Sequence, residues 1–440
     1  MERIPNSRFQ IPNYAYQHLG YPQVPVRAHA SRVKSLVAAA IFGIGATSVA
    51  VPQPAAVSAI RTSRAARATY LARANIWRDP GTLSAAEVLE GSERGLPYTF
   101  EQAATDTGLG CTFTQPGKDI GGGSAKFLCR TADGRDLRVK YWDPESGRGN
   151  REVFATVAAS RLMWALGFNA VPALPLNVRC DRCPENPHEG TGGVRTRRYV
   201  AMVQAPWPTP VILSGGDINQ GWSWKDLDSA IESLPTGPER VRQRTHFDAL
   251  TLLGVFVQHG DRKSGQQRLY CDSPADTAAG NARAARADAT GLTLVERAAG
   301  SACATPAVAI VDVGATFGGA GRTSNDTTAS MNLDEWRRKR VFADARGDEC
   351  RGELTVSLKA GQDGEGDPRI SEEGRSFLVE QLHRLTPDHV RAIFKAARVD
   401  ELTSRSSHHS VEGAGGVDAW VTAFQDKVRQ IESRRCSPAD

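Results

Sequence analysis

Two apolar segments in this chain are each followed closely by an aspartate, and this pair constrains the fold more than any other feature. The first segment, 238–257, has its apolar residues at helical spacing and runs into a polar loop that contains Asp261. The second, 309–311, is a short buried-strand pattern that ends in Asp312-Val-Gly. Two carboxylates held at the ends of rigid elements suit chemistry on phosphates, because one can orient an attacking group while the other holds a metal.

A β-hairpin and a helix are predicted ahead of these acids. Residues 126–131 and 136–141 alternate in polarity and flank an Asp-Gly dipeptide, which is a strong hairpin signal. Lys140 ends the second strand, and Glu152 begins a helix that is predicted to reach residue 168. Further strands are predicted at 173–180 and 196–204, and further helices at 84–89, 332–340, 371–384, 387–397 and 418–433.

The order of these elements predicts an α+β fold with two lobes, a small β-rich N-terminal lobe and a larger helical C-terminal lobe. A Pro-rich stretch at 205–210 separates the two halves. The expected parts are a leader at 1–59, a basic Ala-rich connector at 60–109, the N-lobe at 110–204 and the C-lobe at 205–440, with a mobile low-complexity insertion at 272–302.

The leader has the layout of an export signal. An apolar run at 36–52 follows Arg32 and Lys34, and small residues precede a possible cleavage point after Ala59. The run is either removed as a signal peptide or retained as an N-terminal anchor; a buried core helix is the structural alternative. Both export forms predict a periplasmic or extracellular body that meets the membrane only through this segment.

The charge distribution argues against a nucleic-acid partner. The formal net charge is +5. Residues 1–80, however, hold ten of the 54 basic residues and only two of the 49 acidic ones. The rest of the chain therefore carries a slight excess of negative charge, which gives nucleic-acid binding little support.

The eight cysteines suit an exported chain with disulfides. Cys271 and Cys303 flank the low-complexity insertion, so a bridge between them would close its base. Cys180 and Cys183 form a single Cys-x-x-Cys. A zinc site would need a second pair of ligands, and the chain has no second Cys-x-x-Cys. A thioredoxin-like redox motif would lie at a helix N-terminus, whereas the flanking residues here predict a strand and a turn. We expect a local disulfide there.

On these residues the chain resembles the protein-kinase-like superfamily, in its atypical branches. These are the phosphatidylinositol 3- and 4-kinases, the HipA-type kinases and the secretory-pathway kinases related to Golgi casein kinase. It is also similar to a group of exported bacterial proteins with Val-Lys-Tyr, a Glu-led helix and Cys-x-x-Cys-Pro. The resemblance covers residues 119–318, with helical support to about residue 399.

The resemblance implies a nucleotide site in the N-lobe. Lys140 would contact the α- and β-phosphates of ATP, and Glu152 would position its ammonium. Gly121, Gly122 and Gly123 would cover the phosphates, because glycines let backbone N–H groups approach phosphate oxygens.

In the C-lobe, Asp261 would accept the proton of the attacking hydroxyl, and Asp312 would hold Mg²⁺ or Mn²⁺. The chain departs from the family pattern at two places. Lys263 replaces a histidine of the loop, and Gln266 stands where most relatives have a metal-binding Asn. A Gln carbonyl can ligate the metal, but its longer side chain shifts the ligand position.

Three functions remain open from the sequence. The first is an exported kinase-like phosphotransferase that uses ATP and a divalent metal on a protein, lipid or glycan acceptor. The second is a kinase-fold pseudoenzyme that acts as a binding or scaffold protein of the cell envelope. The third is a disulfide-rich structural protein with no nucleotide site.

Overall fold

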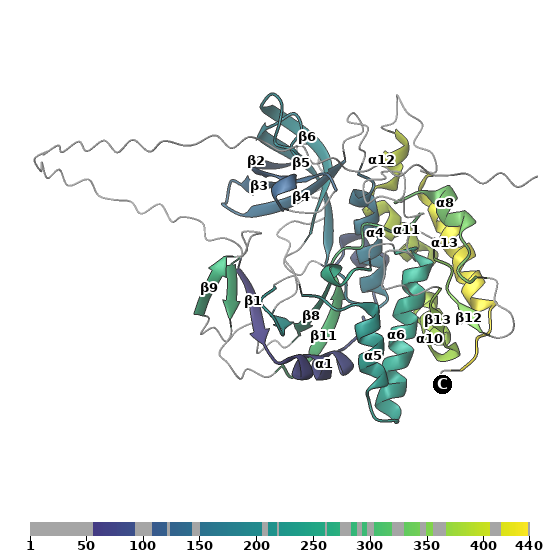
Figure 1. Cartoon of the computed structure of the whole chain (residues 1–440). Helices are drawn as coiled ribbons and strands as arrows, with labels where there is room; N and C mark the ends of the chain where they lie inside the picture. Colours follow the sequence, from purple (N-terminus) through teal and green to yellow (C-terminus); the bar gives the residue numbers. More distant parts are fainter. Residues whose placement is uncertain are drawn as a thin grey trace, which may run out of the picture. The chain divides into compact units, whose positions relative to one another are not determined.

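The computed structural model describes residues 56–92, 108–120, 124–142, 150–204, 210–217, 220–259, 262–272, 283–287, 293–296, 303–318, 330–343, 349–354, 367–404 and 415–438. These residues build an α+β fold from two main sheets and a set of helices (Figure 1). Gly121, Gly122, Gly123 and Asp261 lie outside the described residues, as do the leader run at 36–52 and most of the Pro-rich stretch.

The first sheet is a closed five-stranded barrel with the strand order β2-β3-β4-β6-β5. Its strands are β2 (Leu109–Pro116), β3 (Lys126–Thr131), β4 (Asp136–Trp142), β5 (Ala173–Cys183) and β6 (Arg195–Gln204). The β3–β4 hairpin confirms the prediction from the Asp-Gly turn, where Gly134 has a φ of 86° that favours glycine. Phe127, Tyr141 and Tyr199 pack together inside, with ring centroids 4.8 to 5.8 Å apart.

The second sheet has the order β11-β8-β7-β1-β10-β9. Its strands are β11 (Pro306–Ile310), β8 (Gln267–Cys271), β7 (Val211–Leu213), β1 (Ala56–Arg61), β10 (Thr293–Glu296) and β9 (Arg283–Ala287). Strand β1 pairs in parallel with both β7 and β10. Strand β1 thus comprises the last four residues of the expected leader and the first two of the expected connector, and the segment expected to be a mobile insertion contributes β9 and β10. A two-residue ladder joins β12 (Cys350–Arg351) to β13 (Arg369–Ile370).

Ten helices are described: α1 (Arg64–Ala72), α2 (Ala85–Glu90), α4 (Glu152–Ala165), α5 (Trp224–Glu232), α6 (Pro238–Phe256), α8 (Leu333–Arg338), α10 (Glu372–His383), α11 (Pro387–Ala396), α12 (Val399–Ser404) and α13 (Val417–Glu432). Local chemistry sets several of their starts. Ser84 with Glu87, and Ser223 with Asp226, form capping boxes, and Pro238 occupies the first turn of α6.

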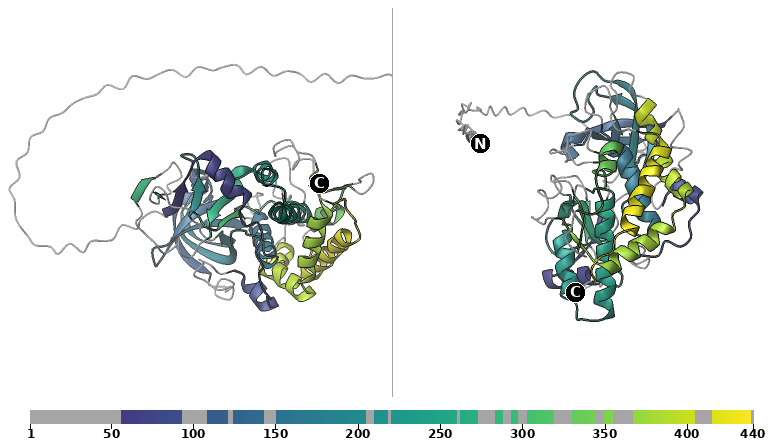
Figure 2. Two further views of the ribbon diagram at one scale, coloured as in Figure 1. Left: turned by 90° about the horizontal axis from the view of Figure 1, so that it is seen from below. Right: turned by 90° about the vertical axis from the view of Figure 1, so that its right-hand side faces the viewer.

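Helix α4 is buried along almost its whole length, although its sequence suggests one apolar stripe. It packs against β5 and β6 of the barrel and against α11 on another side, so no face is left for water. Figure 2 shows α11 and α13 lying side by side, coloured yellow-green to yellow. Phe317, Trp336 and Trp420 form the aromatic centre of this larger core.

The eight cysteines form four disulfides: Cys111–Cys129, Cys180–Cys183, Cys271–Cys303 and Cys350–Cys436. The expected bridge at the base of the insertion and the local bridge within Cys-x-x-Cys are both present. This pairing is consistent with folding in an oxidising compartment. Within the described part of the chain, no helix has the length and apolar character needed to span a bilayer.

Candidate functional site

Lys140 lies on the outer face of the barrel, next to the end of β4. Residues of a strand alternate between its two faces, and Val139 and Tyr141 point into the barrel core. Lys140 therefore faces the opposite way, towards α4 and the segment after β11. Its side chain is only 3% exposed, so its ammonium needs anionic partners within the protein.

Glu152, the first residue of α4, provides one of these partners. Its Oε2 lies 3.2 Å from the Lys140 Nζ. The carboxylate sits in the first turn of the helix, where the helix dipole favours negative charge. The strand-then-helix order in the sequence thus brings the expected lysine and glutamate together.

Asp312 provides the second partner and comes from the other sheet. It follows β11 by two residues, and both of its carboxylate oxygens lie 3.3 Å from the Lys140 Nζ. The Gly314 N–H donates a 3.1 Å hydrogen bond to Asp312 Oδ1. A side chain at Gly314 would come within 3.0 Å of the Glu152 Cβ, so glycine allows this turn to pack closely on α4.

The three charges shift one another's protonation. Burial tends to lower the pKa of Lys140, but Asp312 and Glu152 outweigh it and raise that pKa above its ordinary value. For Asp312, burial tends to raise the pKa, yet Lys140, the Gly314 N–H and Arg138 outweigh burial and lower the pKa to about 2. Burial raises the pKa of Glu152, and Lys140 opposes that rise. The site therefore keeps a charged lysine beside an ionised Asp312.

Two further cations lie on the same side of the barrel, and sequence reasoning missed both. Lys126 pairs with Lys140 across the β3–β4 ladder, and Arg138 precedes Lys140 by two residues on β4. Lys126 is 1% exposed and its Nζ donates to the Ser124 carbonyl at 3.2 Å. Burial, then the nearby charges of Arg138 and Lys140, lower the pKa of Lys126 to about 8. The Asp-Gly turn fixes the hairpin register, so the sequence held a signal for the Lys126–Lys140 pair.

This group of side chains can bind an anion. Three cations, Lys126, Arg138 and Lys140, stand against two carboxylates, which leaves an excess of positive charge around a buried ammonium. Of the two acids, Asp312 has a side chain that is 26% exposed and Glu152 one that is 19% exposed, so a ligand can reach both. Phosphate groups match this combination of fixed cations and accessible oxygens.

The loop that contains Asp261 starts and ends close to the Asp312 segment. The Phe317 N–H donates to the Val257 carbonyl at 2.6 Å, and the Val311 N–H donates to the Gln266 carbonyl at 2.8 Å. Gln266 is thereby bonded to the residue next to Asp312. Lys263, between the two attachment points, is exposed.

Asp312 has the character of a divalent-cation ligand. Its carboxylate is ionised and partly exposed, and Mg²⁺ typically takes one or two carboxylates together with phosphates and waters. The described residues contain no cluster of three or more His, Cys, Asp or Glu side chains that could hold a metal on their own. Asp312 is thus a residue that could share an ion with a bound phosphate and water, and Gln266 lies close to it along the Val311 hydrogen bond.

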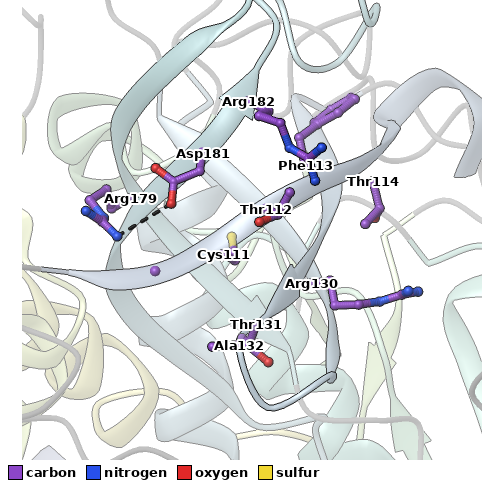
Figure 3. Close-up of a pocket in the computed structure, with 11 residues that line it drawn as sticks. Cys111, Thr112, Phe113, Thr114, Arg130, Thr131, Ala132, Arg179, Asp181 and Arg182 are labelled. Atoms are coloured by element: carbon purple, nitrogen blue, oxygen red, sulfur yellow. Dashed lines mark hydrogen bonds and ion pairs between the residues drawn. The ribbon is translucent and has the colours of Figure 1, made fainter. Parts of the chain in front are cut away.

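A separate pocket of about 410 Å³ is found on the barrel, away from this group (Figure 3). It is lined by β2, the end of β3 and the end of β5. Lys140, Glu152 and Asp312 do not line it, so it forms a second feature of the molecule.

No protein-family model matches the chain, and no curated protein matches its sequence. Among solved structures it is similar to the proinflammatory kinase CtkA of Helicobacter pylori, at 12% identity and a TM-score of 0.34, over 72% of this chain and 90% of that one. A Golgi casein kinase matches at 12% identity and a TM-score of 0.30, over 86% of this chain and 95% of that one.

A Golgi casein kinase with Mn and ADP bound matches at 11% identity and a TM-score of 0.29, over 74% of this chain and 73% of that one. All three solved structures are kinases. In each match the TM-score is below 0.5 and the sequence identity is 12% or less.

Proposed function

We propose that the chain is an exported kinase-like phosphotransferase that uses ATP and Mg²⁺ or Mn²⁺ to phosphorylate a protein, lipid or glycan acceptor. The observation that carries the proposal is the Lys140 ammonium held between Glu152 at 3.2 Å and Asp312 at 3.3 Å. Three charged residues converge there from a strand, a helix and a turn, and Asp312 comes from 172 residues further along the chain than Lys140. This is the arrangement that positions phosphates for transfer.

In this proposal each residue has a separate role. Lys140 binds the α- and β-phosphates, and Glu152 fixes the lysine side chain. Gly121, Gly122 and Gly123 cover the phosphates with backbone N–H groups. Asp312, with Gln266, would hold the metal, which when bound neutralises phosphate charge.

The acceptor side of the site belongs to Asp261. Its carboxylate would take or orient the proton of the attacking hydroxyl, a role that needs a position near the transferred phosphoryl group. Val257 before it and Gln266 after it are both bonded to the Asp312 segment, which supports this placement.

The barrel and the helical part would correspond to the two lobes of a kinase-like fold, with 110–204 as the N-lobe and 205–440 as the C-lobe. The Lys140 site supports this division, since its residues come from both parts: Lys140 and Glu152 from the first and Asp312 from the second. Phosphoryl-transfer sites of this superfamily lie between such lobes.

Export is supported by the four disulfides and by the leader pattern. Ala59 lies within β1 and is fully buried. Cleavage after Ala59 would separate four residues of β1 from the rest of the strand. The intact sheet therefore favours retention of the 36–52 run as an N-terminal anchor.

One observation favours the pseudoenzyme alternative. Both oxygens of Asp312 are already engaged by Lys140, so a metal would have to share or displace that ion pair. The longer Gln266 side chain adds to this difficulty. A pseudoenzyme would bind nucleotide without transferring phosphate, or would bind neither nucleotide nor metal.

The test is a thermal-shift titration of the purified chain with ATP and Mn²⁺. Wild type is expected to show a saturable rise in melting temperature, and Asp312→Ala is expected to abolish the metal-dependent part. Asp261→Ala should keep the rise but remove phosphate transfer. Lys118→Met, which alters an exposed lysine of the short 3-10 turn at Gly117–Ile120, serves as a matched control for Lys140→Met.

Three outcomes are decisive. A shift in wild type and Lys118→Met that Lys140→Met lacks supports a nucleotide site at Lys140. A shift without transfer, together with transfer gained by Gln266→Asn, supports a weakened enzyme. The absence of any shift with millimolar ATP and Mn²⁺ would overturn the phosphotransferase and would favour a pseudoenzyme or scaffold that binds no nucleotide.

A further inference from the structure

The side chains that line the barrel pocket come from β2, the end of β3 and the end of β5 (Figure 3), and the pairing register of these strands sets their positions. Thr112 on β2 lies opposite Arg130 on β3 and opposite Asp181 on β5. These residues share the outer face of the barrel, because the residue before each of them (Cys111, Cys129 and Cys180) belongs to the barrel core. Arg130 is four residues from Lys126 on β3, which is about 13 Å along a strand, so the pocket is separate from the Lys140 site.

Gly110 makes room for one of the pocket's arginines. It pairs with Arg179 across the β2–β5 ladder, and a side chain at Gly110 would come within 3.5 Å of the Arg179 guanidinium. The guanidinium thus lies over bare backbone at the edge of the pocket. A planar cation in this position can present its N–H groups to a bound oxyanion.

The lining carries more positive than negative charge. Arg130, Arg179 and Arg182 line the pocket, whereas Asp181 is the only acidic residue among the described residues that line it. Arg130 is held by Asp136 at 2.8 and 3.0 Å, and Arg179 lies 3.5 Å from Asp181. The structure gives Arg182 no hydrogen bond or ion pair with any other described residue.

Arg182 is also held in a backbone conformation that costs free energy. Its φ is 56°, in the left-handed region that arginine rarely adopts. It lies between Cys180 and Cys183, whose disulfide closes a small ring around it. A strained residue kept in place by a covalent ring is a reason to look for a function of its side chain.

A second disulfide stabilises the rest of the pocket. Cys111 on β2 is bonded to Cys129 on β3, next to Arg130. The two disulfides therefore hold β2, β3 and the end of β5 in place before any ligand binds, which lowers the conformational entropy lost on binding.

We propose that this pocket binds a small organic phosphate or sulfate, with the oxyanion held by Arg182 and by the Thr112 hydroxyl, while Arg179, on the far side of Asp181, adds positive charge to the lining. Guanidinium groups bind such oxyanions through paired, charge-assisted hydrogen bonds. The volume of about 410 Å³ lies within the range, roughly 300–1,000 Å³, of small-molecule pockets, so it has room for the organic part as well. This site does not depend on the proposed nucleotide site.

The test is isothermal titration of the full, oxidised chain at low salt with phenyl phosphate, phenyl sulfate, inorganic phosphate and neutral benzyl alcohol. We expect saturable binding of the two esters, weaker binding of inorganic phosphate and none of the alcohol. Comparing the two esters decides between a phosphate and a sulfate ligand.

Arg182→Asn is the informative variant. Asparagine tolerates a left-handed backbone, so the variant should fold at least as stably as wild type. Loss of one charge-assisted contact should weaken ester binding by about tenfold or more, which corresponds to about 1.4 kcal/mol. Arg195→Asn, which removes a charge from β6 opposite Cys183 but outside the pocket lining, is the matched control and should change binding by less than about twofold.

Two results would overturn the proposal. One is the absence of saturable binding of any anionic probe to wild type. The other is an equal effect of the two variants, or no effect of Arg182→Asn. If Arg182→Asn and Arg195→Asn weaken ester binding equally, the binding comes from diffuse charge. If Arg182→Asn leaves ester binding unchanged, the ester binds elsewhere, for example at the Lys140 site. Loss of ATP binding in Lys140→Met with intact ester binding would leave this proposal standing.

Discussion

The ion pair between Lys140 and Asp312 predicts a stability that depends on pH. Asp312→Asn removes the negative charge and keeps the shape of the side chain. The amide oxygen can still accept the Gly314 N–H that donates to Asp312 Oδ1 at 3.1 Å. The substitution therefore isolates the charge from the hydrogen bond and from the packing of the turn.

The magnitude follows from the Asp312 pKa. The folded protein lowers that pKa from 3.8 to about 2, because Lys140, the Gly314 N–H and Arg138 together outweigh burial. At about 1.4 kcal/mol per pKa unit, the shift is worth about 2 kcal/mol of unfolding free energy. Because the folded pKa is the lower one, this stabilisation is complete above pH 4 or so and is lost as the pH falls towards 2.

Urea unfolding of wild type and Asp312→Asn at pH 7 and near pH 2 measures this difference. Wild type should be more stable by about 2 kcal/mol at pH 7, and the difference should largely vanish near pH 2. Asp133→Asn is the matched control, because Arg135 and Thr131 also lower the Asp133 pKa to about 2 but the residue is fully exposed. Water and salt screen it, so its effect should be smaller and sensitive to salt.

If Asp312→Asn is as stable as wild type at pH 7, the ion pair does not stabilise the fold. If the difference persists unchanged near pH 2, the cost of the substitution comes from packing and not from charge.

Three further predictions follow from the packing and from the disulfides. Gly314→Ala places a Cβ 3.0 Å from that of Glu152 and should lower the unfolding free energy by roughly 1–3 kcal/mol; an unchanged urea midpoint would contradict this. Lys126→Met removes a buried cation whose pKa the fold lowers to about 8. The free energy of unfolding should therefore rise at pH 7 by up to about 3 kcal/mol, and this gain should fade towards pH 10.5. A loss of stability at pH 7 would contradict this prediction. Replacing Cys350 and Cys436 by serine opens a bridge of sequence separation 86 and should cost about 4 kcal/mol of unfolding free energy, which calorimetry under oxidising conditions would detect; a melting temperature equal to that of wild type would oppose it.

Regular local patterns predicted many of the elements well. The 126–131 and 136–141 strands and the helix at 238–257 match β3, β4 and α6 to within one residue at either end. In these segments the period of apolar residues, the Asp-Gly turn and the proline at the helix start all favour the same structure.

Three strands, β1, β9 and β10, were not predicted, because their formation depends on pairing with distant segments of the chain. Strand β1 has an Ala-rich sequence with no clear alternation, and its neighbours β7 and β10 lie far away along the chain. Its strand conformation depends on those neighbours, so a local pattern could not reveal it. The strands β9 and β10, inside a segment of low-complexity composition, were missed for the same reason.

The candidate site was predictable where chain order alone sets the geometry. Lys140 stands near the end of a strand, and Glu152 begins the helix that follows. This order was enough to predict that the two side chains meet. Lys126 was overlooked because its position next to Lys140 depends on the pairing register of two strands. The roles of Asp261 and Gln266 stay predictions that the proposed titrations test.

Binding of nucleotide phosphates beside Lys140, as proposed, can be tested by covalent labelling. An acyl-phosphate derivative of ATP transfers its acyl group to an amine next to the phosphates, and mass spectrometry then identifies the labelled lysine. Lys126, whose pKa of about 8 leaves a larger neutral fraction, and Lys140 should be labelled, and excess ATP with Mn²⁺ should prevent it. Labelling confined to exposed lysines such as Lys118, with no protection by ATP, would contradict the account.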